Sequence, residues 1–441
     1  MIPTRETFGN IPPSSQAWFY LVAAISLGVG ALGFWRRVQR WRQGQPIPPP
    51  AIAGEALGNR LARWRPGLRR LWVEGLGQQR VRGRGLPSWA HGSLVIGFLA
   101  LLLGTTLLEV DHLAGMISEK LRFHHGAYYV GYEFTLDVLG LVFLLGTVLF
   151  FGRRLRRPAS LGHRTTDWYV LGSFLTIGVT GYVVEALRIT WQRPVGLGAW
   201  CSPVGWALAS VFRGLSELQA RHWHLAVWWL HALLVFGFLA AIPYTRLLHI
   251  LAGPLNLLSA PPAVGFLAPV TMAEAEAAGR LGVRDLRHFT WQQLLSLDAC
   301  MECGRCEEAC PATATAKPLS PKRLVQDLRG LLDGLDPDRA GDPSAASEER
   351  FEVHARIAAE TLWSCTACSA CGFVCPVRVD PLRLILDLRR NLVAEGGLRG
   401  TAAVVLRRLQ SSGNPWGLPP EARTDWMPGR NPPSPVGQPT S

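Results

Sequence analysis

Two stretches of the chain, CMECGRCEEACP at 300–311 and CTACSACGFVCP at 365–376, decide how it is built. Both have the spacing C-x2-C-x2-C-x3-C-P. This spacing is typical of thiolates that hold two cubane iron–sulfur clusters, with the last cysteine of each run binding the other run's cluster. It predicts two [4Fe–4S] sites, the first formed by Cys300, Cys303, Cys306 and Cys375, the second by Cys365, Cys368, Cys371 and Cys310.

Zinc binding and disulfide bonding are the other uses of eight cysteines. Zinc sites have no use for the C-x3-C-P ending. Disulfides persist in oxidising compartments, which the membrane topology below argues against. The ninth cysteine, Cys201, stands alone in an apolar stretch and is interpreted as a plain buried thiol.

The N-terminal half has the composition of a membrane protein. The chain is 48% hydrophobic and only 17% charged, with 17 tryptophans. An apolar run of about 20 residues spans a bilayer as a helix, and Trp or Tyr often marks its ends. Five runs qualify, at 18–35, 91–110, 131–151, 168–187 and 223–248. No cleavable signal is expected, because basic residues follow the first run instead of preceding it.

Arginines set the expected orientation. The connections 36–87 and 152–158 are densely basic, whereas 111–130 and 189–222 carry few positive charges. Because basic loops stay in the cytoplasm, the N-terminus is expected outside and everything after about residue 251 inside. This predicts a multi-pass protein of the bacterial inner membrane. These loops also explain the net charge of +13, so no nucleic-acid partner is expected.

Histidines near helix ends predict haem. An ionisable residue inside a membrane is a functional candidate, and bis-imidazole ligation needs one His from each of two helices at matching depth. His91 and His249 meet this condition on the inner side, and His112 and His231 could meet it on the outer side. In one continuous helix, His231 and His249 would share a face, about 27 Å apart.

The haem would be of b type, because the chain has no C-x-x-C-H attachment motif. One haem or two remains open at this point. Rival outer ligands are His124, His125 and His224.

The predicted fold is an all-α membrane bundle of five transmembrane helices followed by a mainly α-helical two-cluster ferredoxin domain. The expected parts are the first transmembrane helix with its basic loop at 1–90, the rest of the bundle at 91–252, a Pro-rich linker at 253–270, the ferredoxin domain at 271–410 and a Pro/Gly-rich tail at 411–441.

A family resemblance supports this plan. The stretch WWLHALLVFGFLAAIPYTRLLHI (228–250) resembles the last helix of the nitrate reductase gamma-type cytochromes b. Together, VTGYVVEALRIT (179–190), FTWQQLLSLDACMECGRC (289–306) and GNPWGLPPE (413–421) resemble the heterodisulfide-reductase-like membrane iron–sulfur oxidoreductases, which include the electron-transfer-flavoprotein:quinone oxidoreductases. The resemblance implies quinone as substrate and a flavoprotein as the soluble electron donor.

The chain departs from these families in two ways. In the nitrate reductase type the two histidines of the second helix are ten apart, but position 101 is Leu101, so the outer pair does not carry over. The C-terminal Cys-Cys-Gly domains of the oxidoreductases have no counterpart in this sequence. A cysteine-rich Cys-Cys-Gly subunit is therefore expected as a partner, unless the sequence is a truncated form.

The expected function is that of a membrane electron-transfer subunit, with the substrate site on a partner chain. Two intramembrane acids, Asp137 and Glu185, are candidates for quinone or proton chemistry, with a Glu185–Arg188 ion pair as the alternative for Glu185. The alternative function is oxidation of quinol with delivery of electrons to a cytoplasmic heterodisulfide or sulfur-compound reductase. A transport or structural protein with a zinc domain is the third class.

Overall fold

The structure is a computed structural model that describes residues 7–47, 60–83, 85–156, 165–194, 201–261, 263–265, 269–335, 352–398 and 400–426. These residues form helices of all lengths, and their only β-type pairings are two isolated bridges. The prediction of an all-α fold is confirmed.

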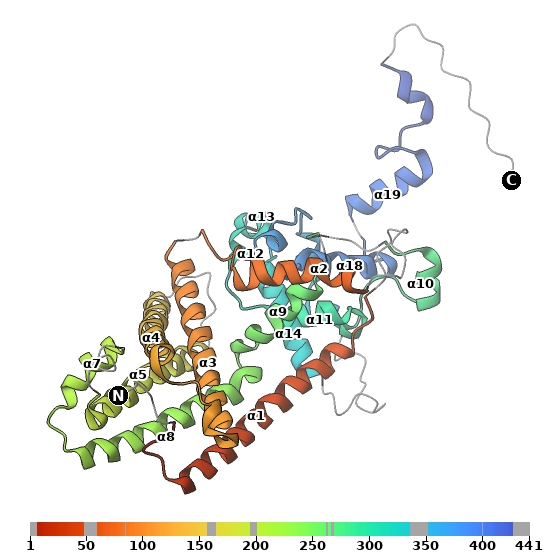
Figure 1. Cartoon of the computed structure of the whole chain (residues 1–441). Coiled ribbons are helices and arrows are strands. Elements are labelled where there is room, and N and C mark those ends of the chain that lie inside the picture. The colour runs from red at the N-terminus through yellow and green to blue at the C-terminus, as the bar shows by residue number, and fades with distance from the viewer. Residues whose placement is uncertain are drawn as a thin grey trace.

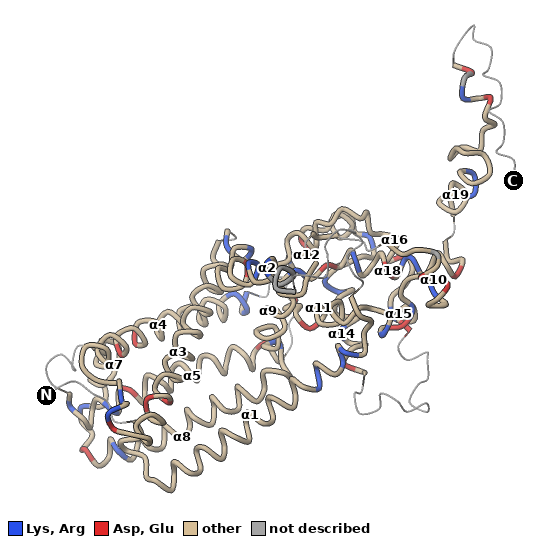
Figure 2. The backbone as a smooth tube through the Cα atoms, turned by 45° about the vertical axis from the view of Figure 1, so that its right-hand side comes forward, with Lys and Arg blue, Asp and Glu red and all other residues tan. Residues whose placement is uncertain are grey.

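Five helices are long and apolar enough to cross a membrane, as predicted. They are α1 (Pro13–Arg42), α3 (Leu86–Ile117), α4 (Gly126–Leu155), α5 (Thr165–Gln192) and α8 (Glu217–Ala241). They form the bundle at one end of the molecule (Figure 1). Charged residues gather toward the helix ends, while most of each helix between is uncharged (Figure 2).

The bundle is built from neighbouring pairs. Helix α3 packs on α4, α4 on α5, α5 on α8, and α8 on α1. Helices α3, α5 and α8 also meet through the rings of Phe98, Phe174 and Phe238, whose centroids lie 5.2 to 6.2 Å apart. Two short elements, α7 (Pro203–Ala209) and η3 (Ser210–Phe212), cover the end of the bundle that lies farther from the cysteine runs.

The fifth helix is shorter than the sequence suggested. It ends at Ala241 and gives way to two 3-10 turns, η4 (Ile242–Tyr244) and η5 (Arg246–Leu248), with extended Thr245 between them. Pro243 lacks an amide hydrogen and its ring crowds the preceding turn, which ends a helix. A new helix, α9 (His249–Ser259), then begins. The expectation that His231 and His249 share one face of a continuous helix is therefore wrong.

The C-terminal half packs many short helices around one core. These are α10 (Met272–Ala278), α11 (Trp291–Ala299), α12 (Arg305–Glu308), α13 (Pro311–Ala314), α14 (Pro321–Gly334), α15 (Val353–Arg356), α16 (Ala359–Trp363), α17 (Ala370–Phe373) and α18 (Pro381–Ala394), with the turn η6 (Leu286–His288). The core continues into the end of α1 through Trp41, whose Nε1 donates to Asp298 at 2.8 Å. The two halves are thus joined through a buried hydrogen bond.

Two predicted boundaries fall inside helices. Helix α9 runs through the first part of the stretch expected to be a linker at 253–270. Helix α19 (Thr401–Ser412) crosses the boundary expected at 410 and projects away from the rest, followed by the turn η9 (Pro420–Thr424) (Figure 1). The part of the expected tail at 427–441 lies outside the described residues.

The basic loop also contains structure that was not predicted. Helix α2 (Arg60–Arg70) continues into a π-helical segment, η1 (Leu71–Leu76), and both pack on α9. The Arg70 guanidinium donates to the carbonyls of Leu257 and Ala260 at 2.9 and 2.7 Å. The loop is therefore docked on the segment that joins the two halves.

Candidate redox sites

The two cysteine loops have the same backbone shape. In each, the residues two and four positions after the first cysteine have positive φ: Glu302 (54°) and Gly304 (81°) in one loop, Ala367 (56°) and Ser369 (62°) in the other. A left-handed residue reverses the chain direction locally, so each loop winds tightly and points several thiols inward. The helices that follow, α12 and α17, lie side by side.

The structure brings the first predicted set of thiols together. Cys306 lies within electrostatic range of Cys300, Cys375 and Cys303. Burial raises the pKa of Cys300 to about 11 and that of Cys375 to about 12. Two thiol sulfurs also accept hydrogen bonds, Cys300 Sγ from the Gln326 amide at 3.3 Å and Cys375 Sγ from the Val379 amide at 3.2 Å.

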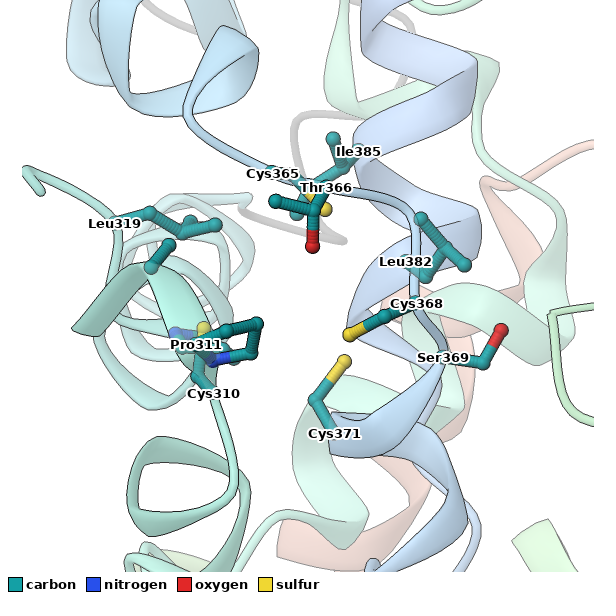
Figure 3. Close-up of a pocket in the computed structure, with 12 residues that line it drawn as sticks. Cys310, Pro311, Leu319, Cys365, Thr366, Cys368, Ser369, Cys371, Leu382 and Ile385 are labelled. Carbon is teal, nitrogen blue, oxygen red and sulfur yellow. The ribbon is translucent and has the colours of Figure 1, made fainter. Parts of the chain in front are cut away.

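The four thiols of the second set line one hollow. Figure 3 shows Cys368 and Cys371 directed into it, with Cys310 on the facing wall. Burial and the nearby Asp380 carboxylate raise the pKa of Cys371 to about 12, with smaller contributions from Cys365 and Cys310. The rest of the wall is apolar or hydroxyl-bearing: Pro311, Ala312, Leu319, Pro321, Thr366, Ser369, Leu382 and Ile385.

Both sets fit an iron–sulfur cubane better than a single ion. Among the described residues, no three His, Cys, Asp or Glu side chains lie close enough together to hold one metal ion. A cubane spreads its four thiolates over four irons, so its ligands are farther apart than the tetrahedral ligands of one zinc ion. An all-cysteine donor set in a mainly apolar wall suits such a cluster, although ligation by these eight thiols stays a prediction.

Charged residues that the sequence did not single out hold the first cysteine loop against the membrane helices. Arg246, directly after the fifth helix, donates to Glu302 Oε2 at 2.8 Å and pairs with Asp167 of α5 at 3.0 Å. Asp167 also pairs with Arg154 of α4 at 2.6 Å. All four side chains are largely buried, so this network ties two membrane helices to the loop between Cys300 and Cys303.

A second connection comes from the basic loop. The Arg80 guanidinium donates to the carbonyls of Phe373 and Cys375 at 2.8 and 3.3 Å. In return, Arg305 donates to the Arg80 carbonyl at 2.7 Å. Burial opposes ionisation of Glu74, but hydrogen bonding by Arg378 and the charge of Arg80 together lower its pKa. In the sequence, the basic loop that holds these residues is only a dense run of arginines. Membrane topology was a sufficient reason for that run, so its contacts with the cysteine runs were not predicted.

His91 and His249 lie beside this connection. The two imidazoles are within electrostatic range of each other, and His91 is also within range of Arg305. His91 Nδ1 lies 3.1 Å from Gln78 Oε1, and His249 Nδ1 lies 2.7 Å from the Arg246 carbonyl. An oxygen acceptor on Nδ1 leaves the lone pair on Nε2, which is how ligating histidines are oriented.

The inner pair therefore fits a haem. Burial lowers the pKa of His249 and so favours its neutral imidazole, which is the form that binds a metal. The structure thus brings together the two histidines predicted as inner ligands, and places them next to the first cysteine loop. Haem ligation by His91 and His249 stays a prediction.

The outer histidines are not brought together in the same way. His231 faces α5, with Nδ1 2.9 Å from Thr180 Oγ1. His112 contacts the ring of Phe8 at 4.9 Å, and its buried Nδ1 has no hydrogen-bond partner among the described residues. Phe8 in turn contacts Trp228 at 5.8 Å, so a ring separates His112 from the fifth helix at this depth.

The rival outer histidines have other neighbours. His124 is buried among Tyr128, Tyr129 and Tyr132. His224 lies 3.3 Å from the Asn10 amide and contacts Trp191, while His125 forms the cap of α4. Leu101 of α3 stands where the nitrate reductase type has its second histidine, and it packs in the apolar core of the bundle.

The two intramembrane acids lie in one buried polar cluster at the far end of the bundle. Asp137 accepts from the backbone amides of Val204 and Gly205 at 2.8 and 3.1 Å, so it anchors the start of α7. Glu185 pairs with Arg188 at 2.5 Å, which is the alternative weighed for it, and Glu133 lies 3.7 Å from the same guanidinium. A role in proton transfer stays a prediction.

Known proteins resemble the chain over both halves. A family model described as a 4Fe-4S dicluster domain matches residues 296–379, which include both cysteine runs. The chain is 31% identical to the EtfAB:quinone oxidoreductase of Syntrophomonas wolfei over 97% of its own length and 61% of the relative's. It is also 31% identical to a probable membrane-anchored ferredoxin of Chromohalobacter salexigens, over 91% of the chain and 56% of the relative.

A third relative matches in part. It is one polypeptide of the dihydromethanophenazine:CoB–CoM heterodisulfide reductase of Methanosarcina barkeri, and it is 29% identical over 33% of the chain and 36% of its own length. The chain thus spans little more than half of the first two relatives, and a smaller share of the third. No solved structure matches the chain.

Proposed function

Because the chain is a homologue of the heterodisulfide-reductase-like membrane iron–sulfur oxidoreductases, we propose that it carries electrons between a soluble redox partner and the membrane quinone pool. The observation behind this proposal is the position of the first cysteine set. Its loop is bound by buried charges to the membrane helices and lies beside His91 and His249. A redox centre at the membrane surface and a haem site inside it are thus direct neighbours.

The chain's own residues would bind and tune the redox groups. The eight thiols would hold two [4Fe–4S] clusters, which supply one-electron chemistry when bound. His91 and His249 would hold haem b, with Gln78 and the Arg246 carbonyl fixing their imidazoles. Arg246 and Arg80 would keep the first cluster site and the haem site at a constant separation. Arg246 binds Glu302 of the first loop, and Arg80 binds the carbonyl of Cys375, the cysteine that the second run contributes to the first set.

The favoured donor is an electron-transfer flavoprotein, as the name of the Syntrophomonas wolfei relative suggests. A cysteine-rich Cys-Cys-Gly region, on a partner subunit or a further part of the protein, would lie between that flavoprotein and the clusters. The alternative is electron flow in reverse, from quinol to a heterodisulfide or sulfur-compound reductase, as the name of the Methanosarcina barkeri relative suggests.

The proposed location is the bacterial inner membrane, with the cysteine runs in the cytoplasm. The basic ends of α1 and α4, which carry Arg40, Arg42, Arg153 and Arg154, lie at the same end of the bundle as the cysteine runs. Positive residues flank membrane helices on the cytoplasmic side, so this arrangement supports a cytoplasmic ferredoxin domain and an external N-terminus.

One experiment tests the connection between the halves. Protein purified anaerobically in detergent is reduced with dithionite and then mixed with a water-soluble menaquinone analogue, and the cluster and b-haem spectra are followed. We expect both signals to be reoxidised, and His249→Ala to abolish reoxidation of the clusters while leaving their iron in place. If cluster reoxidation by the quinone persists unchanged in His249→Ala, or the wild-type protein holds no haem, the proposal is wrong.

A further inference from the structure

The two cysteine loops share a backbone but have opposite surroundings. Matching positions carry Glu302 and Arg305 in the first loop but Ala367 and Ala370 in the second. Glu302 is 6% exposed and bound to Arg246, and Arg305 is bound to the carbonyls of the basic loop. The first loop is therefore anchored toward the membrane domain by its own charged side chains, whereas Arg80 reaches the second run at the backbone carbonyls of Phe373 and Cys375.

The second loop faces outward instead. Cys368 is an exposed cysteine, and its neighbours Thr366 and Ala367 are exposed as well. Of the hydrogen bonds and ion pairs made by the described residues, none joins residues 365–371 to a membrane helix or to the basic loop. The hollow between Cys368, Cys371 and Cys310 borders this open side (Figure 3).

Two exposed aromatic rings flank this loop. Trp363, two residues before Cys365, is 37% exposed, and Phe373, two residues after Cys371, is 71% exposed. Each ring has a guanidinium against it, Arg389 at 5.0 Å from the Trp363 centroid and Arg80 at 5.9 Å from the Phe373 centroid. Cation–π contacts of this kind hold a ring in place, so both rings are fixed in outward positions.

Apart from the two guanidinium groups that lie against the rings, the surface beside the loop carries little charge. The segment 311–318, which follows Cys310, faces the loop. Its exposed residues are small or apolar except for Lys317, which is charged. Fixed aromatic side chains around a weakly charged centre are the usual anchors of a protein–protein interface.

We propose that the second cysteine set is the outer redox site, where a soluble redox protein docks and exchanges electrons. The first set is then the inner redox site, which exchanges electrons with the haem site of the membrane domain. The contact face of the partner would be uncharged and apolar around its own redox centre, and would cover Trp363, Phe373 and the exposed thiol loop. This inference rests on the proposed function. One electron leaves the partner's centre as the second site gains it, then passes to the first site, with no proton required.

The order of the sites can be tested by their access to water. A dysprosium–EDTA complex stays in the aqueous phase and relaxes the electron paramagnetic resonance signal of nearby reduced clusters. We expect strong relaxation of the cluster that remains in Cys303→Ser and at least fivefold weaker relaxation of the one that remains in Cys368→Ser. In the wild-type protein one of the two signals should relax at least fivefold more strongly than the other. Equal relaxation of both signals, or the reverse order, overturns the inference.

This result is separable from the proposed function. A protein with no iron–sulfur signal at all would refute the proposed function itself. A protein with two signals of equal access would leave that function standing and remove only the order of the sites.

The docking surface is tested with a photo-crosslinking residue, p-benzoylphenylalanine, placed at Phe373 in the full chain in its native membrane. The matched control has the same residue at Trp416, which is also 71% exposed but lies in the projecting segment after α19. We expect a crosslink at 373, and none at 416, to a protein shown by mass spectrometry to bind flavin or an iron–sulfur cluster. The proposal is overturned if position 373 crosslinks to a second copy of the chain or to lipid. It is also overturned if no crosslink forms at 373 in membranes whose haem is still reduced by the soluble fraction.

Discussion

Replacement of Arg246 by Met should weaken the attachment of the first cysteine loop to the membrane domain. At 2.8 Å and an effective dielectric constant of about 20, the attraction between the Arg246 guanidinium and Glu302 is about 6 kcal/mol. Desolvation of the two ions offsets much of this. The side chains are only 9% and 5% exposed, so water cannot replace the lost partner.

The expected cost follows from which carboxylate loses its partner. Removal of one member of a buried pair costs about 3–5 kcal/mol. Asp167 keeps Arg154 at 2.6 Å, so the lost attraction falls mainly on Glu302. We therefore expect Arg246→Met to destabilise the docked state by about 3 kcal/mol. Removal of both charges, in Arg246→Met with Glu302→Gln, should restore most of that loss.

A guanidinium chloride titration of the detergent-solubilised protein measures this effect through the loss of cluster absorbance. The matched control is Arg221→Met, which removes an arginine paired with Glu217 at 2.9 Å, because those side chains are 41% and 63% exposed. An exposed pair contributes at most about 1 kcal/mol. The reasoning is refuted if Arg246→Met costs no more than Arg221→Met, or if the double variant is as unstable as the single one.

Three further predictions concern the cofactors. Iron analysis of anaerobically purified protein should give about eight irons, and Cys303→Ser or Cys368→Ser should each lose about half, whereas Cys201→Ser should lose none; zinc in place of iron would contradict this. His91→Ala and His249→Ala should each abolish the same b-type signal in reduced-minus-oxidised spectra, and full haem in both variants would exclude the pair. Burial raises the pKa values of Cys300, Cys371 and Cys375 to about 11–12, so above about pH 9 the folded, cluster-free protein binds more protons than the unfolded protein. Its melting temperature should therefore fall as the pH rises beyond 9. A melting temperature that does not change with pH would show that these thiols are not buried.

The elements that the sequence predicted best are those with a strong local pattern. Apolar runs of membrane length and repeated cysteine spacings each depend on a few neighbouring residues, and both are found where they were expected. The sequence also paired His91 with His249, and the two imidazoles lie near each other, but their haem ligation stays a prediction and the argument from one continuous helix was wrong. Pro243 ends that helix, and His249 reaches the site from the start of α9 instead.

The parts that the sequence did not predict depend on contacts between distant segments. The basic loop is amphipathic and rich in arginine, so membrane topology was a sufficient reason for its charge. In the folded chain, Arg80 lies against residues almost 300 positions away, at the carbonyls of Phe373 and Cys375. Likewise, nothing local to the fifth helix indicates that Arg246 pairs with Glu302 rather than with a lipid headgroup.

These contacts give two similar loops different surroundings. Repetition of the cysteine spacing supplies two redox sites with the same internal geometry, so a difference between them must come from the residues around them. Buried positive charge close to a cluster favours its reduced form, and hydrogen bonds to sulfur act in the same direction. The first site has Arg305 against its loop, with the ion pairs Arg246–Glu302 and Arg329–Asp298 beside it, whereas Arg389 donates to the Cys365 carbonyl at the second site. The two sites thus differ in how the charges around them are paired, and a measured difference between their reduction potentials would show in which direction the proposed path runs.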